Sequence, residues 1–462
     1  MRLSSGLLFV VASLATSVVL ISSRADAEST PVAPVAPVPP TPGLRRMSAA
    51  ECVELALHHN VDVLNSGEEI TATEAERAAV RGQLGPKLHA DASARRWTEA
   101  YTIPFSLDPT KPPSAFPVHD AFEWNATVTL TQPITGLVAI LDAYKIRDLG
   151  VDMATIRRDV ARRDAAYKVV ESYYRLAQGE QLMGVAKASV EQLQAQLRQA
   201  NSFHENGVVS QNDVLRAQLA VANAQQRVIG LGARVSLERS RLAVLMGMPP
   251  DALIDAQPLA SAELPPPDAQ TLAQDEQSAE LQRIELVEVD KRVEAAHRTA
   301  GIAWLRLVPQ VSAVGAYLHT EGSPFTQKNS AYVGAVASWD VWDWGATSSA
   351  IPLAKARARQ AALARTKLSD QIRLEVRQAY VDVASAAEAS TVAKASVAQA
   401  GENFRLVTKR YEANAATSFD VVDAEGLLTQ ARGQLETALY DHAIARAALR
   451  RAIGTPPESI AR

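Results

Sequence analysis

The chain has 462 residues and a formal net charge of −4 at pH 7. A charge so close to balance argues against a nucleic-acid partner, because proteins that bind nucleic acid usually carry a basic surface. The single cysteine, Cys52, excludes an internal disulfide, so stability must come from packing or from assembly.

The N-terminal segment has the layout of a secretory signal peptide. Arg2 precedes an apolar stretch from Leu7 to Ile21, which is too short for a comfortable membrane span. The residues Ala25-Asp26-Ala27 follow as a small-residue cleavage site. We therefore predict a cleaved signal peptide over residues 1–27. Because prolines favour a stiff, extended chain, we predict a Pro-rich linker over residues 28–46.

Two long segments without proline predict the helical part of the chain. They run between residues 133 and 249 and between residues 352 and 456, and both are rich in the helix formers Ala, Leu, Gln, Arg and Glu. A short polar turn interrupts each segment once, over residues 205–210 in the first and 412–417 in the second. We therefore expect two long antiparallel helices in each segment, which meet at a tight tip and pack like a coiled coil.

The two proline-free segments are copies of each other. Tyr174 aligns with Tyr380 and Asp213 aligns with Asp420, at a nearly constant offset along the chain. The period is too long for a solenoid repeat and indicates a duplicated half-protein. The predicted organisation is a first structural repeat over residues 47–250, an inter-repeat linker over 251–280, a second structural repeat over 281–457 and a C-terminal tail over 458–462.

Each repeat also contains two short segments that predict β-strands. In the clearest, Phe122 to Thr131, apolar and polar residues alternate, which gives the strand one apolar and one polar face. The other three cover residues 88–94, 309–319 and 331–341, and a Pro-rich loop is expected over 101–121. About ten residues suffice for a tilted transmembrane strand. No apolar run of the mature chain has the length of a membrane helix, so a membrane crossing would have to use strands.

Most of the tryptophans lie in or beside these predicted strands. Two interpretations are open: the aromatic side chains form the core of a sheet, or they form a girdle at the bilayer interface. The clean alternation of residues 122–131 favours the girdle. The candidate membrane-interface aromatics are Trp97, Phe122, Trp124, Tyr332 and Trp339.

The strand count implies an oligomer. Four strands are too few to close a barrel, and an open strand edge is not tolerated in lipid. Several chains must then contribute four strands each. The alanine-rich helices agree with this, because small residues allow close contact between helices of neighbouring chains in a ring. Sequence spacing alone does not choose the number of copies.

Over residues 48–457 the chain resembles the TolC family of outer-membrane efflux and secretion channels. The resemblance is carried by the duplication, by the segments Leu130-Thr-Gln-Pro-Ile134 and Glu375-Val-Arg-Gln-Ala-Tyr380, and by the two tip motifs over 206–214 and 411–424. It implies a fold that is mainly α with a small β part. The duplicated helical hairpins of a trimer would form a periplasmic α-barrel, and four transmembrane strands per chain would form a twelve-stranded barrel.

The resemblance also implies a location and partners. The chain would lie in the outer membrane, in contact with lipid, with a long periplasmic extension. It would serve as the passive exit duct of a tripartite efflux pump or of a type I secretion system. Its partners would be a periplasmic adaptor and an inner-membrane pump. The alternative from the residues alone is a periplasmic helical scaffold or adaptor without a pore.

The same resemblance implies a gate at the periplasmic end. Asp420 and Asp423 share one helix face and would give rings of carboxylates in a trimer, while Tyr411 and Asp213 would link neighbouring helices. Two of these acids have a structural alternative. Ser210-x-x-Asp213 and Thr417-x-x-Asp420 resemble capping boxes, so both residues are also candidate helix caps. For Tyr411 the alternative is ordinary packing between helices.

The two tips are the expected contacts for the adaptor. The second tip departs from the family pattern, because Asn414 stands where glycine is usual, although asparagine tolerates a left-handed backbone. The candidate contact residues are Asn206, Gly207, Val208, Ser210, Asn414, Ala415 and Thr417.

Nothing in the sequence predicts an enzyme. No H-E-x-x-H, phosphate loop, G-x-S-x-G or Cys/His pairing is present, and the histidines are scattered along the chain. We therefore expect no catalytic residue, no metal site and no cofactor.

Overall fold

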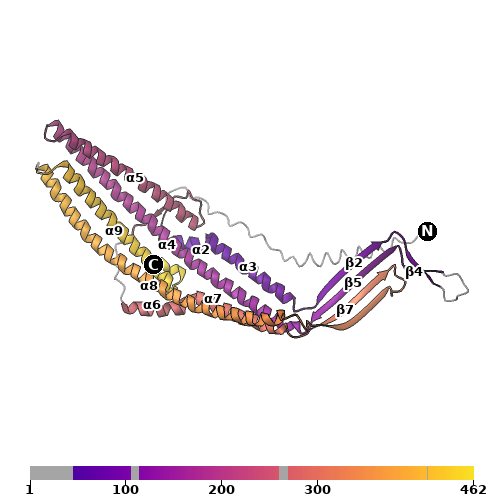
Figure 1. The fold of residues 1–462 in the computed structure, drawn as a ribbon. Helices are drawn as coiled ribbons and strands as arrows, with labels where there is room; N and C mark the ends of the chain where they lie inside the picture. Colours follow the sequence, from indigo (N-terminus) through magenta and orange to yellow (C-terminus); the bar gives the residue numbers. More distant parts are fainter. Residues whose placement is uncertain (1–44, 106–113, 260–268, 414, 462) are drawn as a thin grey trace.

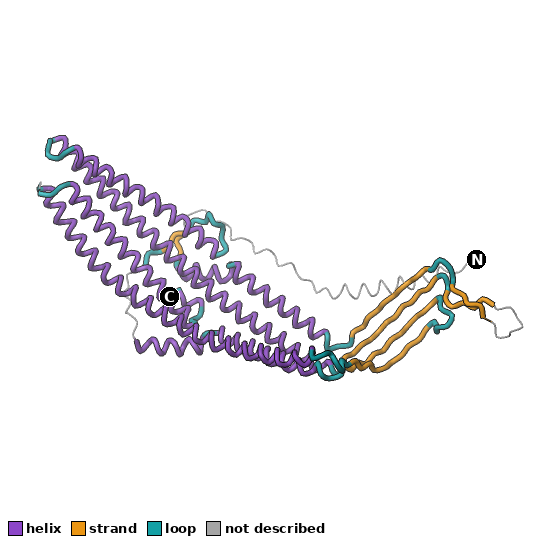
Figure 2. Tube along the Cα trace, viewed as in Figure 1, coloured by secondary structure: helices purple, strands orange, loops and turns teal. Residues whose placement is uncertain are grey.

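The computed structural model describes residues 45–105, 114–259, 269–413 and 415–461. A long body of helices makes up most of the molecule, and a small sheet extends from one end of it (Figure 1; Figure 2). The fold is therefore mainly α with a small β part, as predicted. The predicted signal peptide, residues 28–44 of the predicted linker and Asn414 lie outside the described residues.

The first repeat consists of two helices, a pair of sheet strands and a long helical hairpin. Helices α2 (Ala49–His59) and α3 (Val61–Gly82) precede the strands, and α4 (Gly136–Glu205) and α5 (Gln211–Leu245) follow them. Helix α4 has 70 residues and is about 105 Å long at a rise of 1.5 Å per residue. The predicted long hairpin is confirmed.

The second repeat has the same order of elements. Helices α6 (Ala269–Gln282) and α7 (Ile284–Leu305) precede its strands, and the hairpin of α8 (Ala346–Glu412) and α9 (Ser418–Ile453) follows, with the short α10 (Pro457–Ile460) at the end. Helix α9 packs against α4, so the four long helices lie side by side in the order α5, α4, α9, α8 (Figure 1). The duplication seen in the sequence is thus a duplication of structure.

Four strands form one antiparallel sheet. Their spatial order is β2 (Lys87–Arg96), β5 (Phe122–Pro133), β7 (Gln310–Glu321) and β8 (Asn329–Ser338), which confirms the four predicted strands. Strands β5 and β7 join the two repeats. The outer edges of β2 and β8 have no strand partner within the described part of the chain.

The pairing register sorts the side chains of the sheet into two faces. Val128 lies opposite Ala90 on one side and opposite Tyr317 on the other, and Leu130 lies opposite Leu88. These apolar residues therefore share one face, and much of it is exposed. Threonines occupy the other face of β5. The sheet thus has an apolar face that the described residues leave largely uncovered.

Two small ladders were not predicted. Strands β3 (Tyr101–Phe105) and β4 (Ser114–His119) form a hairpin within the segment expected to be a Pro-rich loop. Proline is tolerated there because a two-stranded hairpin has only edge strands. Strand β1 (Arg45–Met47) pairs in parallel with β6 (Ile254–Ala256), so β1 crosses the expected boundary between linker and first repeat. Three-residue strands are too short to show a period in sequence.

The largest buried cluster lies at mid-length of the helical body. There α2, the β1–β6 ladder and residues 257–259, which together we name the belt, pack against α4 and the end of α5. The hydroxyl of Tyr173 in α4 donates to the carbonyl oxygen of Met47 at 3.0 Å and accepts from the backbone N–H of Gln257 at 2.8 Å. One side chain therefore ties the long helix to both belt strands.

A carboxyl pair also joins the belt to the long helices. Glu180 of α4 shares a hydrogen bond with the carboxyl of Asp255 in β6, and Arg239 of α5 contacts Glu180 at 2.9 Å. Burial, with the neighbouring Asp255, raises the pKa of Glu180 to about 7, against the pull of Arg239. The belt is thus attached to α4 through a group that titrates near neutral pH.

A chain of ion pairs connects helices α4, α7, α8 and α9. Arg163 of α4 pairs with Glu285, Arg283 pairs with both Glu285 and Glu375, and Arg451 of α9 reaches Glu375 at 3.0 Å. Arg283 also donates to the carbonyl oxygen of Ala452 at 2.9 Å. Because each buried charge has an opposite partner, this network fixes α4, α7, α8 and α9 relative to one another.

Candidate functional site: the helical tips and the aromatic sheet

The first tip joins α4 to α5. Gly207 adopts a left-handed backbone with φ of +69°, a conformation that glycine accepts without strain. Ser210 caps α5: its hydroxyl accepts from the N–H of Asp213 at 3.3 Å and donates to the Asp213 carboxylate at 2.6 Å. Asp213 is therefore a helix cap, as one of the two interpretations predicted. Val208, in the turn itself, is half exposed.

The second tip repeats this capping box at the start of α9. The N–H and the hydroxyl of Thr417 both donate to the Asp420 carboxylate, each at 2.8 Å. These hydrogen bonds lower the pKa of Asp420. Both use Oδ2, and Oδ1 has no hydrogen-bond partner within the described residues. Asp420 thus caps α9 and still presents one carboxylate oxygen outward, as does the exposed side chain of Asp423 one turn later.

Tyr411 connects the two tips. Its side chain is buried at the end of α8, and its ring lies 5.5 Å from that of Phe203 in α4. Burial raises the pKa of Tyr411, and the nearby Asp213 raises it further. Asp213, on the other hairpin, is therefore near enough to act on Tyr411 through its charge, but the buried Tyr411 hydroxyl has no hydrogen-bond partner among the described residues.

Sequence reasoning missed three residues at the tips. Phe203 packs on Tyr411, and the guanidinium of Arg216 in α5 lies 5.6 Å from the ring centre of Phe419 in α9. The repeat alignment contained part of the signal, because Arg216 occupies the position of Asp423 in the other copy.

The candidate membrane-interface aromatics divide between the two faces of the sheet. Phe122 and Trp124 lie on the apolar face, and the Trp124 ring is 4.9 Å from that of His319. Tyr332 pairs with Ala316 on the opposite face. Trp97 follows β2 and donates to the Glu123 carboxylate at 3.3 Å, which also places it with the polar residues.

Trp339 lies at the other end of the sheet, directly after β8 and close to the helices. Trp342 and Trp344 follow it and are 75% and 89% exposed, with ring centres 5.8 Å apart. Large aromatic side chains therefore mark both ends of the four-stranded sheet, one strand length apart.

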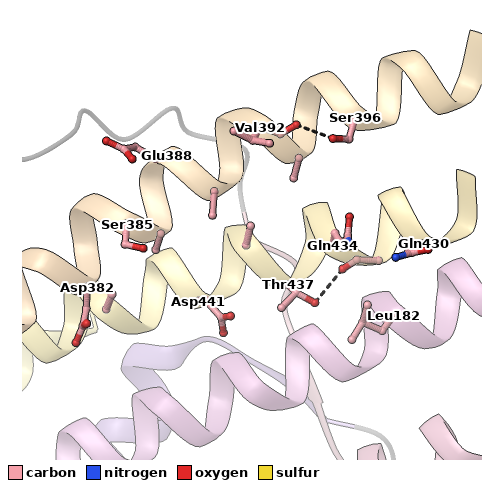
Figure 3. A pocket seen from close by; sticks show the side chains of 16 residues that line it. Leu182, Asp382, Ser385, Glu388, Val392, Ser396, Gln430, Gln434, Thr437 and Asp441 are labelled. Atoms are coloured by element: carbon pink, nitrogen blue, oxygen red, sulfur yellow. Dashed lines mark hydrogen bonds between the residues drawn. The ribbon is translucent and has the colours of Figure 1, made fainter. Parts of the chain in front are cut away.

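A groove of about 970 Å³ separates α8 from α9 in the middle of the second hairpin (Figure 3). Small residues such as Ala393 and Gly433 leave this space, and Leu182 of α4 closes one side. The hydroxyls of Ser396 and Thr437 donate to carbonyl oxygens of their own helices, at 3.0 and 2.9 Å.

Two structural criteria bear on other kinds of site. Within the described ranges no helix is both long and apolar enough to cross a membrane. The same residues contain no group of three or more His, Cys, Asp or Glu side chains arranged to hold a metal ion.

The chain is similar in fold to several outer-membrane channels. It matches the outer membrane protein VceC of Vibrio cholerae with a TM-score of 0.72 and 17% identity, over 88% of this chain and 96% of that one. It matches the CmeC outer membrane channel of Campylobacter jejuni with a TM-score of 0.73 and 16% identity, over 88% and 85% of the two chains. For the MtrE outer membrane channel of Neisseria gonorrhoeae the TM-score is 0.70 and the identity 17%, over 88% and 89%.

A family assignment rests on the sequence itself. No curated protein matches the chain. The sequence profile described as "Outer membrane efflux protein" matches residues 52–248 and 276–455, which cover both repeats. This match disfavours a periplasmic scaffold without a pore, and the family is one of channels rather than of enzymes. The chain therefore belongs to the outer membrane efflux protein family, and it is an outer-membrane channel-tunnel of the efflux type.

Proposed function

We propose that three copies of this chain form one channel that spans the outer membrane and extends through the periplasm. The observation that carries this proposal is the open sheet. Strands β2 and β8 each leave one edge unpaired among the described residues, and lipid does not tolerate such an edge. Pairing β8 of one copy with β2 of the next would close a ring of twelve strands.

The outer helices support the same arrangement. In the row α5, α4, α9, α8, the two outer helices carry exposed apolar side chains along their length. In a ring, α5 of one copy would cover α8 of its neighbour. On α5 these residues are Leu215, Leu219, Ile229 and Leu237, and on α8 they are Leu363, Leu374, Val381 and Val392.

The apolar face of the sheet is the proposed lipid contact. Phe122 and Trp124 would lie near one interface and Trp339 near the other, since aromatic rings favour the headgroup level. Trp97 and Tyr332 would then face the interior of the barrel. In this arrangement the helical body lies in the periplasm, reached after cleavage of the predicted signal peptide.

The tips are the proposed gate and docking site. Three copies of Asp420 and of Asp423 would form two rings of carboxylates, which favour cations and resist crowding. The pair of Tyr411 and Asp213 would hold the hairpins together when the channel is closed. A periplasmic adaptor, coupled to an inner-membrane pump, would contact the tips at Asn206, Gly207, Val208, Ser210, Asn414, Ala415 and Thr417.

Single-channel recording in planar bilayers tests the proposal. The wild type is expected to give small, cation-selective current steps. The double variant Asp420→Asn/Asp423→Asn should lose that selectivity, whereas Glu191→Gln, an exposed acid on α4, should not. If the current steps of the double variant keep their cation selectivity, the two aspartates do not form the gate, but the protein is still a channel. A protein that stays soluble and gives no current would overturn the proposal altogether.

A further inference from the structure

A pocket of about 360 Å³ lies where the belt meets the long helices. We name it the belt pocket. It is distant in the chain from the tips and uses none of the residues assigned to the gate or to the sheet. The residues that line it include Ser48 and Ala49 at the start of α2, Tyr174 of α4, Gln257 after β6, and Arg446 and Arg450 of α9.

Within the described ranges, the two arginines of the belt pocket have no acidic partner. They stand one turn apart on the same face of α9. Arg450 donates to the carbonyl oxygen of Ile460 at 3.2 Å, and Nη1 of Arg446 is buried without any hydrogen-bond partner among the described residues. Arg451, the next residue, pairs with Asp164 at 2.8 Å and with Glu375 at 3.0 Å. Arg446 and Arg450 thus differ from their neighbour Arg451, which has two acidic partners.

The pKa shifts of the neighbouring groups also reflect the positive charges of Arg446 and Arg450. Burial lowers the pKa of Arg450, and Arg446 lowers it further. Burial also lowers the pKa of His442, again with Arg446 adding to the effect. Burial raises the pKa of Tyr174, and the charges that act on it are those of Arg450 and Arg446. No carboxylate of the described residues contributes to these shifts, so the belt pocket carries a positive potential.

The start of α2 adds to this potential, because a helix N-terminus carries a partial positive charge. The nearest acid there is Glu51, and its carboxylate already accepts from the N–H of Ser48 at 2.7 Å and from the Ser48 hydroxyl at 2.9 Å. A half-buried guanidinium that lacks both an ion pair and a hydrogen bond is costly in a folded protein. A ligand that supplies the missing acceptors would remove that cost.

We propose that the belt pocket binds a phosphate group, held by Arg446 and Arg450. A guanidinium presents two parallel N–H groups that match a pair of phosphate oxygens. Two guanidiniums balance the charge of a phosphate monoester dianion, and the Tyr174 hydroxyl lies in the same pocket to donate a further hydrogen bond. Inorganic phosphate and a small organic phosphate share this chemistry. Once bound, the group would brace α9 against α4 and the belt.

Calorimetric titration of the full-length channel in non-ionic detergent tests the assignment. Inorganic phosphate is the probe, with chloride holding the ionic strength constant and sulfate as a second tetrahedral anion. We expect saturable binding that sulfate competes for. Arg446→Gln and Arg450→Gln should each weaken it by about tenfold or more, since each removes charge-assisted hydrogen bonds. Arg432→Gln, an exposed arginine on the same helix, is the matched control and should bind as the wild type does.

A second variant separates loss of the site from loss of the fold. Arg446→Glu places a carboxylate one turn from Arg450, so the protein supplies its own anion. Its melting temperature should rise in phosphate-free buffer, and phosphate should no longer raise it. A titration with glycerol phosphate distinguishes an organic phosphate from inorganic phosphate as the ligand. The compound that binds with the higher affinity represents the natural class of ligand. The assignment would be overturned if injections of phosphate and of chloride gave equal heats. It would also be overturned if Arg446→Gln bound phosphate with the affinity of the wild type.

Discussion

The ring of Phe203, near the end of α4, lies 5.5 Å from the ring of Tyr411, near the end of α8. This aromatic pair joins the two hairpins at the tips, together with the contact of Arg216 with Phe419. Tyr411 is only 2% exposed, so its ring is held by packing on several sides. The spacing of the hairpins at the tips therefore depends in part on this buried contact.

Replacing Phe203 with alanine should loosen the tips. An aromatic pair contributes about 0.5–1.5 kcal/mol beyond its buried area, so Phe203→Ala should shift the channel toward its open state. Single-channel recording should show larger or more frequent steps, and limited proteolysis should cut the tips faster. Phe325→Ala, in the loop between β7 and β8, is the control. Equal behaviour of the two variants would mean that the Phe203–Tyr411 pair does not hold the tips.

The capping box of α9 predicts an acid-sensitive helix start. Hydrogen bonds from Thr417 lower the pKa of Asp420 below its ordinary value of 3.8. The charged form thus stabilises the helix above that value, and the contribution is lost as the pH falls through the lowered pKa. Amide hydrogen exchange of the first turn of α9 should rise in acid. Asp420→Asn should raise it at neutral pH, whereas Asp423→Asn should not, since Asp423 lies beyond the cap.

The belt should respond to pH in the opposite direction. Burial, with Asp255, raises the pKa of Glu180 from its ordinary 4.5 to about 7. The protonated form is therefore favoured in the fold, and its stabilisation is present below 4.5 and is lost as the pH rises toward 7. Amide exchange of strands β1 and β6 should increase over this range. Glu180→Gln should flatten the dependence. If amide exchange of β1 and β6 depends on pH as strongly in Glu180→Gln as in the wild type, another group causes the pH response.

Removing one buried arginine from the ion-pair network should destabilise the helical body. Arg283 is 6% exposed and bonds to Glu285, Glu375 and the carbonyl oxygen of Ala452. Arg283→Met leaves each carboxylate with one remaining arginine and leaves the carbonyl oxygen of Ala452 without this donor, which should cost about 1–3 kcal/mol. Arg292 lies on the surface and pairs with Glu288 one turn away on α7, so Arg292→Met should cost less than about 0.5 kcal/mol. The midpoint of denaturant unfolding measures both, and equal midpoints would contradict the role of the network.

The two faces of the sheet should differ in their tolerance of charge. Val128 and Thr129 are neighbours in β5 that point to opposite faces. If the apolar face contacts lipid, Val128→Arg should reduce the stability of the inserted protein by about 2–4 kcal/mol. Thr129→Arg should be tolerated. Folding into lipid vesicles measures the difference, and equal tolerance would contradict a lipid contact at Val128.

The long helices and the four sheet strands were predictable because their signals extend over many residues. The absence of proline from residues 134–248 marks α4 and α5, and the alternation of 122–131 marks β5. The second hairpin shows the limit of that signal. Helix α8 begins at Ala346, before Pro352, because Asp343 accepts hydrogen bonds from the N–H groups of Gly345 and Thr347 and so starts the helix earlier.

The site was predictable only in part. The capping boxes at Ser210 and Thr417 can be read directly from sequence, and both form. The contact of Phe203 with Tyr411 could not be predicted, since it depends on how two hairpins from different repeats are placed side by side. The sorting of aromatic side chains between the two faces of the sheet could not be predicted either. Tyr332 and Phe122 lie on different faces, because of the pairing register of β7 and β8.

The pairing of β5 with β7 constrains the order of folding. These strands belong to different repeats, and the whole of α4 and α5 lies between them in the chain. Bringing them together closes a very large loop, which makes the step slow and late. The helical hairpins consist of local contacts and can form first. During export the chain should therefore pass through a water-soluble intermediate with finished helices and separated strands, which becomes competent for insertion only when its second half has arrived.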